Sequence, residues 1–415
     1  MDTRPIVIIG AGECGTRAAF ALREQGYTGE VVLLGGESLL PYERPPLSKE
    51  AITTPATPEP RLIATAGRFA EAGIAFLAGH TAVRLDRAKQ EVECHTADGT
   101  PATFPYSRLL LAAGSSPRTI DIPGMDGNPH CVSLRTLQDA LLIRSALHAG
   151  KRLLILGGGL IGMELAASAR QLGCSVTVIQ RDPTILNRGV PDVLAAALHE
   201  RHCTEGVNIR CQAGIRQIET TADGLRVHLQ DGDKVACDLV VTAIGAVPNT
   251  RIAQQAGLAV ADGITVDACL QTSDPLVFAA GDCCNFPSPF NGQRTRLETW
   301  RNAQEQGTLA ARNLLGQAEP IQSVPWFWSD QYDWGLQVAG WPELASHTVR
   351  RELSDNAVLL FHLHADGRLV AASGLGVSTR VAKDIRVADL LIARQASPDP
   401  ALLADPAFPL KKLLK

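Results

Sequence analysis

Two stretches with the same layout decide the fold: "PIVIIGAGECGTRAAFALREQG" (Pro5–Gly26) and "RLLILGGGLIGMELAASARQLG" (Arg152–Gly173). Each has an apolar run of strand length, then G-x-G-x-x-G, then a helical pattern that ends on glycine. A second apolar strand follows each stretch, "EVVLLGGE" in the first case and "SVTVIQRD" in the second. This is the order of a strand–helix–strand dinucleotide-binding unit, so the sequence predicts two such units.

The glycines of the two motifs have separate roles. The first glycine permits the tight turn off the strand, the second lets the backbone approach a pyrophosphate, and the third lets helix and strand pack closely. The N–H groups at the helix start and the positive end of the helix dipole then face the phosphates. We therefore expect six glycines at nucleotide sites: Gly10, Gly12 and Gly15 in the first motif, and Gly157, Gly159 and Gly162 in the second.

Composition excludes several classes of protein. A chain of 415 residues is long enough for two or three domains. The net charge of −4, without a Lys/Arg run, argues against nucleic acid as a partner. The apolar stretches are too short and too glycine-broken for a bilayer, so no membrane is expected, and the early strand leaves no room for a signal peptide. Ten scattered cysteines without metal-ligand spacing predict free thiols in the cytoplasm and no metal site.

Two nucleotide sites in one chain predict two cofactors that exchange electrons, a tightly held flavin and a visiting nicotinamide. Three later segments run from a strand into small residues, where a backbone can touch a ligand: "LLLAAGSSPR", "LVVTAIGAVPN" and "VFAAGDCCNFP". They contain Ala112, Gly245 and Gly281. Asp282 can accept hydrogen bonds from a polyol such as the ribityl chain of FAD, although aspartate is also common in turns and helix caps.

With these segments the chain resembles the FAD-dependent ferredoxin reductases of bacterial cytochrome P450 and Rieske oxygenase systems, the putidaredoxin-reductase-like group. The resemblance rests on both glycine motifs and on "PYERPPLSK", "LRTLQDA", "AIGAVPN", "TSDPLVFAAGDC", "RLETWRNAQEQ" and "PWFWSDQYD". It implies an α/β fold with two Rossmann-like domains in a glutathione-reductase-like architecture, plus a C-terminal α/β domain. The expected domains are FAD-binding (1–149 and 243–317), NAD(P)-binding (150–242) and C-terminal reductase (318–415).

The resemblance also implies an activity and a set of site residues. Hydride would pass from NAD(P)H to FAD, and single electrons to a [2Fe–2S] ferredoxin that serves a cytochrome P450 or Rieske oxygenase; the oligomeric state stays open. Lys49 and Glu164 would form a catalytic pair near the reactive edge of the flavin, although Glu164 also suits a helix N-terminus electrostatically. The remaining FAD contacts implied are Gly10, Gly12, Cys14, Gly15, Glu37, Arg44, Val83, Ala112, Arg135, Asp282, Trp300 and Trp328. Glu37 would replace the aspartate that the family has after its second strand, and core packing is the alternative for both tryptophans.

The end of the second nucleotide unit leaves the choice between NADH and NADPH open. Gln180 stands where an acid would accept the 2′-hydroxyl hydrogen bond of NAD adenosine, so the charge that repels a 2′-phosphate is absent. Arg181 and Arg188 could pair with that phosphate, which favours NADPH. The alternative is that Gln180 bonds the ribose hydroxyls and Arg181 faces solvent, and the family resemblance favours NADH.

Other activities compatible with the pattern are an NAD(P)H oxidase or quinone reductase, and a flavin-bearing interaction protein similar to apoptosis-inducing factor. Disulfide reduction is disfavoured because "PYERPPLSK" contains no cysteine and a bridge between Cys283 and Cys284 would be strained. Both should be buried thiols. Cys14 lies at a helix start, where a thiolate is favoured. His362 and His364 are two residues apart on a predicted strand, and we expect a surface-facing pair and not a metal site.

Overall fold

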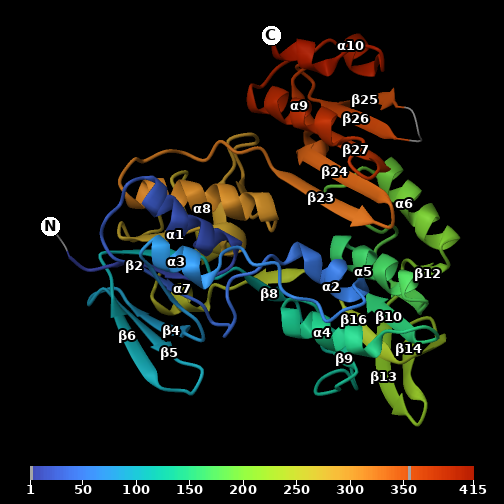
Figure 1. Cartoon of the computed structure of the whole chain (residues 1–415). Coiled ribbons are helices and arrows are strands. Elements are labelled where there is room, and N and C mark those ends of the chain that lie inside the picture. Colours follow the sequence, from blue (N-terminus) through green and yellow to red (C-terminus); the bar gives the residue numbers. More distant parts are fainter. Residues whose placement is uncertain (1–2, 354–356) are drawn as a thin grey trace. The chain divides into compact units, whose positions relative to one another are not determined.

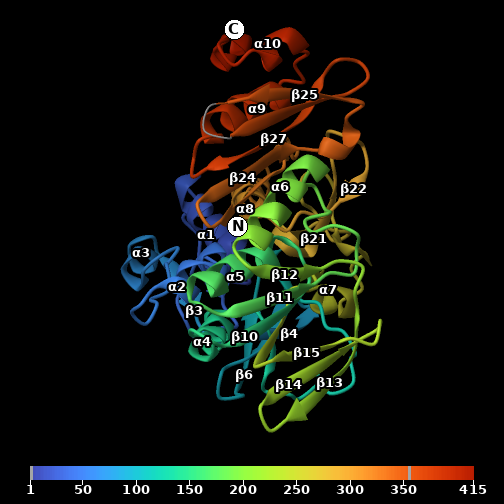
Figure 2. The same ribbon diagram turned by 90° about the vertical axis from the view of Figure 1, so that its right-hand side faces the viewer.

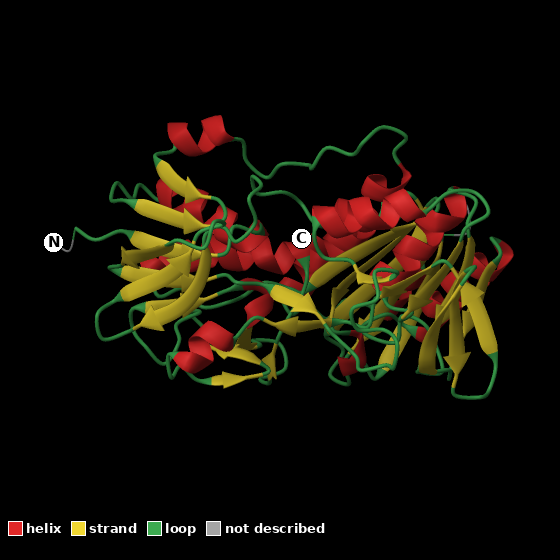
Figure 3. Ribbon diagram, turned by 90° about the horizontal axis from the view of Figure 1, so that it is seen from below, coloured by secondary structure: helices red, strands yellow, loops and turns green. Residues whose placement is uncertain are grey.

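The computed structural model describes residues 3–353 and 357–415. Helices and strands are both abundant in it, as the α/β prediction requires (Figure 3). The chain forms two compact units. Unit 1 contains Met1–Glu43, Pro60–Ser116 and Val247–Ser323, and unit 2 contains Arg44–Glu59, Pro117–Ala246 and Val324–Lys415. The division into three functional domains stays a prediction.

Unit 1 is built on a five-stranded parallel sheet in the order β20-β7-β1-β2-β3. The central strands read "IVII" and "VVLL" and are buried along their whole length, as expected of parallel strands covered on both faces. The strands are β1 (Ile6–Ile9), β2 (Val31–Leu34), β3 (Ile74–Leu77), β7 (Arg108–Leu111) and β20 (Val277–Ala279).

Helix α1 (Glu13–Glu24) begins directly after the first glycine turn and packs against α8 (Trp300–Leu314) (Figure 1). The two helices approach closely because Gly307 has no side chain; a Cβ there would lie 2.5 Å from the Cys14 carbonyl oxygen. The other elements of unit 1 are α3 (Ala66–Glu71), α7 (Arg251–Gln255), η2 (Gly281–Cys283), an antiparallel sheet of β4 (Thr81–Asp86), β5 (Glu91–His95) and β6 (Pro101–Pro105), and a sheet of β18 (Val260–Ala261), β19 (Gly263–Thr265), β21 (Cys284–Pro287) and β22 (Arg294–Thr295).

Unit 2 repeats the parallel design in a sheet of order β12-β11-β10-β16-β9, and Figure 2 shows β10, β11 and β12 side by side. Helix α5 (Leu160–Gln171) follows the second glycine turn as α1 follows the first. The strands are β9 (Cys131–Ser133), β10 (Arg152–Leu156), β11 (Ser175–Ile179), β12 (Val207–Arg210) and β16 (Leu239–Thr242). Also in unit 2 are η1 (Pro45–Ser48), α2 (Glu50–Thr53), α4 (Leu137–Ala146), α6 (Asp192–Thr204) and an antiparallel sheet of β13 (Ile215–Thr221), β14 (Gly224–Leu229) and β15 (Lys234–Cys237).

The C-terminal part of unit 2 is a five-stranded antiparallel sheet in the order β23-β24-β27-β26-β25, with α9 (Ala382–Ala393) packed on β24 and β27 (Figure 1). The strands are β23 (Trp326–Gln331), β24 (Trp334–Gly340), β25 (His347–Glu352), β26 (Val358–Leu363) and β27 (Leu369–Val377). Short helices η3 (Pro342–Leu344), α10 (Pro400–Ala404) and η4 (Leu410–Leu414) complete it. Strands β8 (Ser115–Pro117) and β17 (Ala246–Pro248) contain boundaries between the units.

The prediction of a surface-facing histidine pair is wrong. All of β26 is buried, and His362 is only 3% exposed, with hydrogen-bond contacts to Thr348 and Ser373. His364 lies just beyond the strand and pairs with Asp366. Among residues 3–353 and 357–415, no group of three or more acidic, histidine or cysteine side chains could hold a metal ion. Nor does any helix within those ranges have the length and apolar character to cross a bilayer.

Candidate active site

The first glycine turn, in unit 1, has the geometry of a phosphate site. Gly10 has φ +104, and a Cβ there would lie 2.2 Å from the carbonyl oxygen of Ala112, so only glycine fits. A Cβ on Gly15 would lie 1.9 Å from the Gly10 oxygen, so this glycine permits the close helix–strand packing. Gly12 is different, because an added Cβ would meet nothing within 4 Å. It is also the N-cap of α1, where no side chain caps the helix, so the backbone N–H groups at the helix start receive no side-chain cap.

The side chains next to this turn are held by hydrogen bonds within unit 1. Ser115 donates to Asp282 at 3.0 Å, and the Gly281 N–H donates to the Gln306 side-chain oxygen at 2.7 Å. Trp300 donates through Nε1 to the Glu13 carboxylate at 3.1 Å. Burial raises the pKa of Glu13, and the hydrogen bonds from Gln304 and Trp300 oppose that rise. The loop residues and α8 are thus fixed to the start of α1.

Three further predicted FAD contacts also lie in unit 1. Tyr42 donates to Glu37 at 2.6 Å and so orients the carboxylate that follows β2. Ala112 is buried and supplies the oxygen next to Gly10. Val83 lies on β4 with 37% of its surface exposed. Sequence reasoning missed the role of Tyr42 in holding Glu37, although the tyrosine stands in the quoted "PYERPPLSK".

The cysteines do not form a redox pair. Cys14 is a buried free thiol, and burial raises its pKa well above the usual range, which outweighs the preference of a helix start for a thiolate. Cys283 and Cys284 are buried free thiols, as predicted, and burial raises the pKa of Cys283 to about 11. A disulfide reduction centre therefore has no support in unit 1.

The second glycine turn, in unit 2, repeats the first. Gly157 has φ +112 and approaches the Ala243 oxygen, to which a Cβ would come within 2.4 Å. An added Cβ on Gly159 would meet nothing within 4 Å, whereas one on Gly162 would lie 2.1 Å from the Gly157 oxygen. Gly245, also with a positive φ, accepts a backbone hydrogen bond from Arg118 at 2.9 Å. In both turns the second glycine of the motif has free space beside its Cα, whereas the first and third glycines are packed against neighbouring backbone.

Gln180, at the end of β11, has an internal role. It is 8% exposed, its Oε1 accepts from the Gly158 N–H at 2.9 Å, and its Nε2 donates to Asp182 at 3.1 Å. Asn187 also donates to Asp182, at 2.8 Å. Arg181 is exposed, and Arg188 is exposed as well. The amide therefore joins the glycine turn to a carboxylate two residues further on, which the sequence analysis did not single out.

Arg44, Arg135, Lys49 and Trp328, predicted as FAD contacts, belong to unit 2. Arg44 donates to the Arg135 backbone oxygen at 2.5 Å. Trp328 stacks on Trp326 with ring centroids 5.2 Å apart. Of these four residues, Arg44 and Arg135 are therefore in contact through a hydrogen bond, and the Lys49 ammonium lies over the Trp328 ring.

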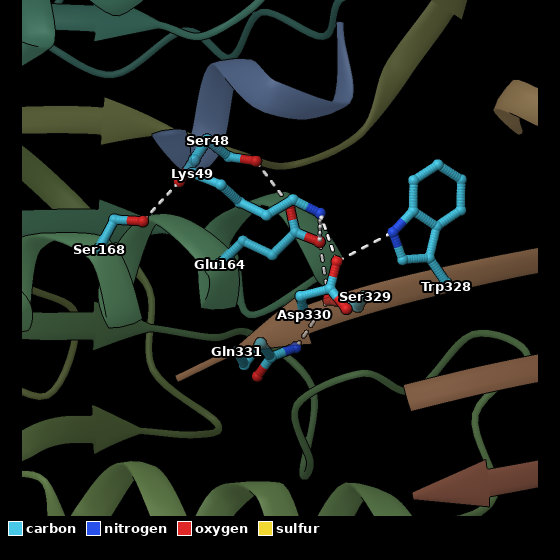
Figure 4. Close-up of polar contacts among 8 residues, drawn as sticks. All are labelled: Ser48, Lys49, Glu164, Ser168, Trp328, Ser329, Asp330 and Gln331. Carbon is cyan, nitrogen blue, oxygen red and sulfur yellow. Dashed lines mark hydrogen bonds and ion pairs between the residues drawn. The ribbon is translucent and has the colours of Figure 1, made fainter. Parts of the chain in front are cut away.

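Lys49 and Glu164 form the polar centre of unit 2 (Figure 4). The Lys49 ammonium lies 3.3 Å from the Glu164 carboxylate, 3.4 Å from Asp330 and 5.5 Å from the centre of the Trp328 ring. Trp328 in turn donates through Nε1 to Asp330 at 3.0 Å. The ammonium therefore lies between two carboxylates and an aromatic face, and it is positioned from three directions.

Glu164 is 7% exposed and accepts hydrogen bonds from two serines. Ser48 donates to its Oε2 at 2.5 Å and Ser329 to its Oε1 at 2.8 Å. Burial raises the pKa of Glu164, while Lys49 and the two serines oppose that rise. Neither serine was predicted, because the contact depends on which face of η1 and β23 meets α5. Their only sequence signal is their presence in "PPLSK" and "PWFWSD".

Comparison with known proteins agrees with this architecture. Residues 4–307 match the family model described as pyridine nucleotide-disulphide oxidoreductase, and residues 326–414 match the model described as reductase C-terminal. The ferredoxin–NAD(+) reductase component of the anthranilate 1,2-dioxygenase system of Burkholderia cepacia is 40% identical over all of both chains. Putidaredoxin reductase of Pseudomonas putida is 34% identical over 99% of this chain and 96% of its own.

Solved structures give the same result. The reductase in the covalent putidaredoxin reductase–putidaredoxin complex superposes with a TM-score of 0.92 at 32% identity, over 100% of this chain and 99% of that one. A ferredoxin reductase from Rhodopseudomonas palustris gives a TM-score of 0.91 at 33% identity, over 98% and 99%. The predicted resemblance and fold class are confirmed. The chain belongs to the pyridine nucleotide-disulphide oxidoreductase family, and to those members that carry the reductase C-terminal domain.

Proposed function

We propose that the protein is an FAD-dependent NAD(P)H:ferredoxin reductase that passes single electrons to a [2Fe–2S] ferredoxin of a P450 or Rieske oxygenase system. The observation that carries this proposal is the pair of open glycine turns, at Gly12 and Gly159, within a chain similar over its full length to ferredoxin reductase components. Bound FAD would supply the chemistry that accepts a hydride and returns electrons singly. The protein supplies binding, orientation and charge.

The residues of unit 1 fit an FAD dinucleotide. The uncapped start of α1 offers backbone N–H groups to a pyrophosphate in the open space beside Gly12, with a favourable helix dipole. Asp282, oriented by Ser115, can accept a hydrogen bond from a polyol, and Glu37, oriented by Tyr42, can accept one from a ribose. Lys49, held by Glu164 and Asp330, is the cation that the family resemblance assigns to the flavin. The three-domain division given above and a cytoplasmic location are part of this proposal, and the free thiols support the latter.

We infer that NADH is the preferred nucleotide. The Gln180 amide already holds Gly158 and Asp182, so Asp182 brings a carboxylate to the end of β11, where a 2′-phosphate would be repelled. The names of relatives agree in part: the Burkholderia protein is an NAD(+) reductase, whereas one from Sphingomonas is named for NAD(P)(+). Arg181 and Arg188 are exposed and would face solvent.

An anaerobic titration tests both statements. The purified protein is mixed with NADH or NADPH while the visible flavin spectrum is followed, and the reduced protein is then given a [2Fe–2S] ferredoxin. NADH should bleach the flavin at concentrations at least tenfold below those of NADPH, and Asp182→Asn should narrow that ratio. Equal use of both nucleotides would contradict the NADH preference. Absence of flavin, or electron transfer to oxygen or quinones and not to ferredoxins, would contradict the reductase proposal.

A further inference from the structure

A buried row of hydrogen bonds leads from Glu164 away from Lys49 to the tip of the β23–β24 hairpin and to helix α6. Ser329 donates to Glu164 at 2.8 Å, and Gln331 donates through Nε2 to the Ser329 oxygen at 3.0 Å (Figure 4). His202 Nε2 lies 2.8 Å from the Gln331 side-chain oxygen, and His202 Nδ1 lies 3.0 Å from the Tyr332 hydroxyl. We refer to these four residues as the relay: Tyr332, His202, Gln331 and Ser329.

The relay has one direction. An amide oxygen can only accept, so the His202 Nε2 must carry the proton, and Nδ1 must then accept from the Tyr332 hydroxyl. Burial lowers the pKa of His202 to about 4, which keeps the ring neutral, with one proton, at pH 7. Every donor therefore points along the row toward the Glu164 carboxylate. Hydrogen bonds in such a chain polarise and strengthen one another, most of all when the last acceptor is charged.

The hairpin tip is held so that the relay stays closed. Tyr332 has φ +57, a left-handed conformation that costs a non-glycine residue free energy, so the position keeps a tyrosine against local preference. Arg201 lies 5.4 Å from the centre of its ring and 5.6 Å from that of Trp334, and pairs with Asp333 at 3.1 Å. These contacts fix the turn on α6, where His202 is fully buried.

We propose that the relay holds Glu164 in its ionised form and thereby fixes the Lys49 ammonium, so that its members are positioning residues for the proposed hydride step. Ser329 donates to Oε1 of Glu164 and Ser48 to Oε2, so both carboxylate oxygens accept hydrogen bonds, as the ionised form requires. The other charged groups around Glu164 are Lys49 and, beyond it, Asp330; around His202 they are Arg201 and Glu205, with His199 near. The inference rests on the proposed function for its catalytic consequence, but not for the ionisation itself.

The test reverses the hydrogen bond between Gln331 and Ser329 with a side chain of nearly the same shape. Gln331→Glu keeps the acceptor for His202 but removes the donor to Ser329, so that the Ser329 proton turns away from Glu164. Infrared difference spectroscopy of the oxidised holoprotein follows the carboxylic acid band of Glu164 against pH, and Glu164→Gln assigns that band. In the variant the titration should move upward by about one pH unit, the size expected for losing one hydrogen bond to a charged group.

Matched variants separate the relay from packing. Gln331→Met removes the donor without adding charge and should shift the titration in the same direction. Tyr332→Phe removes only the far hydroxyl and should give a smaller shift, and it serves if the core variants do not fold. Asp333→Asn removes the charge that pairs with Arg201, but Arg201 keeps its contacts to the Tyr332 and Trp334 rings, so the turn should stay in place and the titration should be unchanged. The acid limb of flavin reduction by NADH should move with the infrared titration.

Two results would overturn the proposal. Wild-type titration in both Gln331 variants would mean that Lys49 and Ser48 alone set the charge of Glu164. An equal shift in Asp333→Asn would mean that hairpin packing, and not hydrogen-bond direction, is responsible. The infrared experiment needs neither NADH nor ferredoxin, so a failure of the reductase proposal would leave this result interpretable.

Discussion

Two alanine substitutions three residues apart, Gly159→Ala and Gly162→Ala, should have opposite effects. Gly159 has φ −80 and ψ −176, which any residue adopts, and an added Cβ would meet nothing within 4 Å. The substitution should therefore preserve stability, or raise it by about 0.4–1 kcal/mol by restricting the unfolded chain. If a pyrophosphate approaches the backbone here, the methyl group should cost about one charge-assisted hydrogen bond, which is roughly a tenfold or larger weakening of NADH binding.

Gly162 lies in the same turn, but a Cβ there would come within 2.1 Å of the Gly157 oxygen and 3.4 Å of the Ala243 Cβ. Overpacking of this kind costs about 1–3 kcal/mol or more. Thermal unfolding of the nucleotide-free holoprotein and a titration with NAD+ separate the two effects. Gly159→Ala should unfold as the wild type does and bind poorly, whereas Gly162→Ala should unfold earlier. Normal binding by Gly159→Ala, or normal stability of Gly162→Ala, would refute the assignment of the two glycines.

Three further outcomes are expected. Burial lowers the pKa of His362 to about 4, below its value of about 6.5 in an unfolded chain, so its contribution to stability is present above pH 6.5 and is lost as the pH falls toward 4. Between pH 7 and pH 5 the free energy of unfolding of the wild type should therefore fall by about 2 kcal/mol more than that of His362→Gln. The unfolding can be followed by the fluorescence of the four tryptophans in 324–415. Glu164→Gln should slow flavin reduction by NADH about tenfold in stopped-flow traces, because the charge facing Lys49 is lost. Thermal stability should change little, because the amide can still form hydrogen bonds with the two serines. An unchanged rate would show that the Glu164 charge does not contribute to the reaction. Asp282→Asn should release FAD on dilution more readily than Ser115→Ala does, because Ser115 only orients the carboxylate. If Asp282→Asn retained FAD as well as the wild type does, Asp282 would not be part of the FAD site.

The repeated motifs allowed the fold to be predicted because each packed glycine is required by a local condition, either a positive φ or a close contact with neighbouring backbone. Gly10 and Gly157 need a positive φ against a neighbouring strand, and that requirement is readable from spacing alone. Lys49 and Glu164 are 115 residues apart, and their pairing came from the family resemblance and not from any local pattern.

The contacts that sequence reasoning missed depend on which face a side chain takes after packing. From the sequence, Gln180 was predicted to contact a ribose. In the structure its amide oxygen instead accepts a hydrogen bond from the Gly158 N–H. His202 and Gln331 are 129 residues apart, and their hydrogen bond depends on the position of the β23–β24 turn against α6. His362 was predicted at the surface because two histidines alone are too few for a metal site, whereas β26 lies between β27 and β25 and is buried along its whole length.

The most direct test of the reductase account is single-turnover electron transfer under anaerobic conditions. The holoprotein is reduced with one equivalent of NADH and mixed with two equivalents of an oxidised [2Fe–2S] ferredoxin from a related oxygenase system. The account predicts that the flavin is bleached by NADH and then reoxidised while the iron–sulfur absorbance falls by two equivalents. A flavin that stays reduced in the presence of the ferredoxin, but reoxidises rapidly when oxygen or a quinone is added, would contradict it.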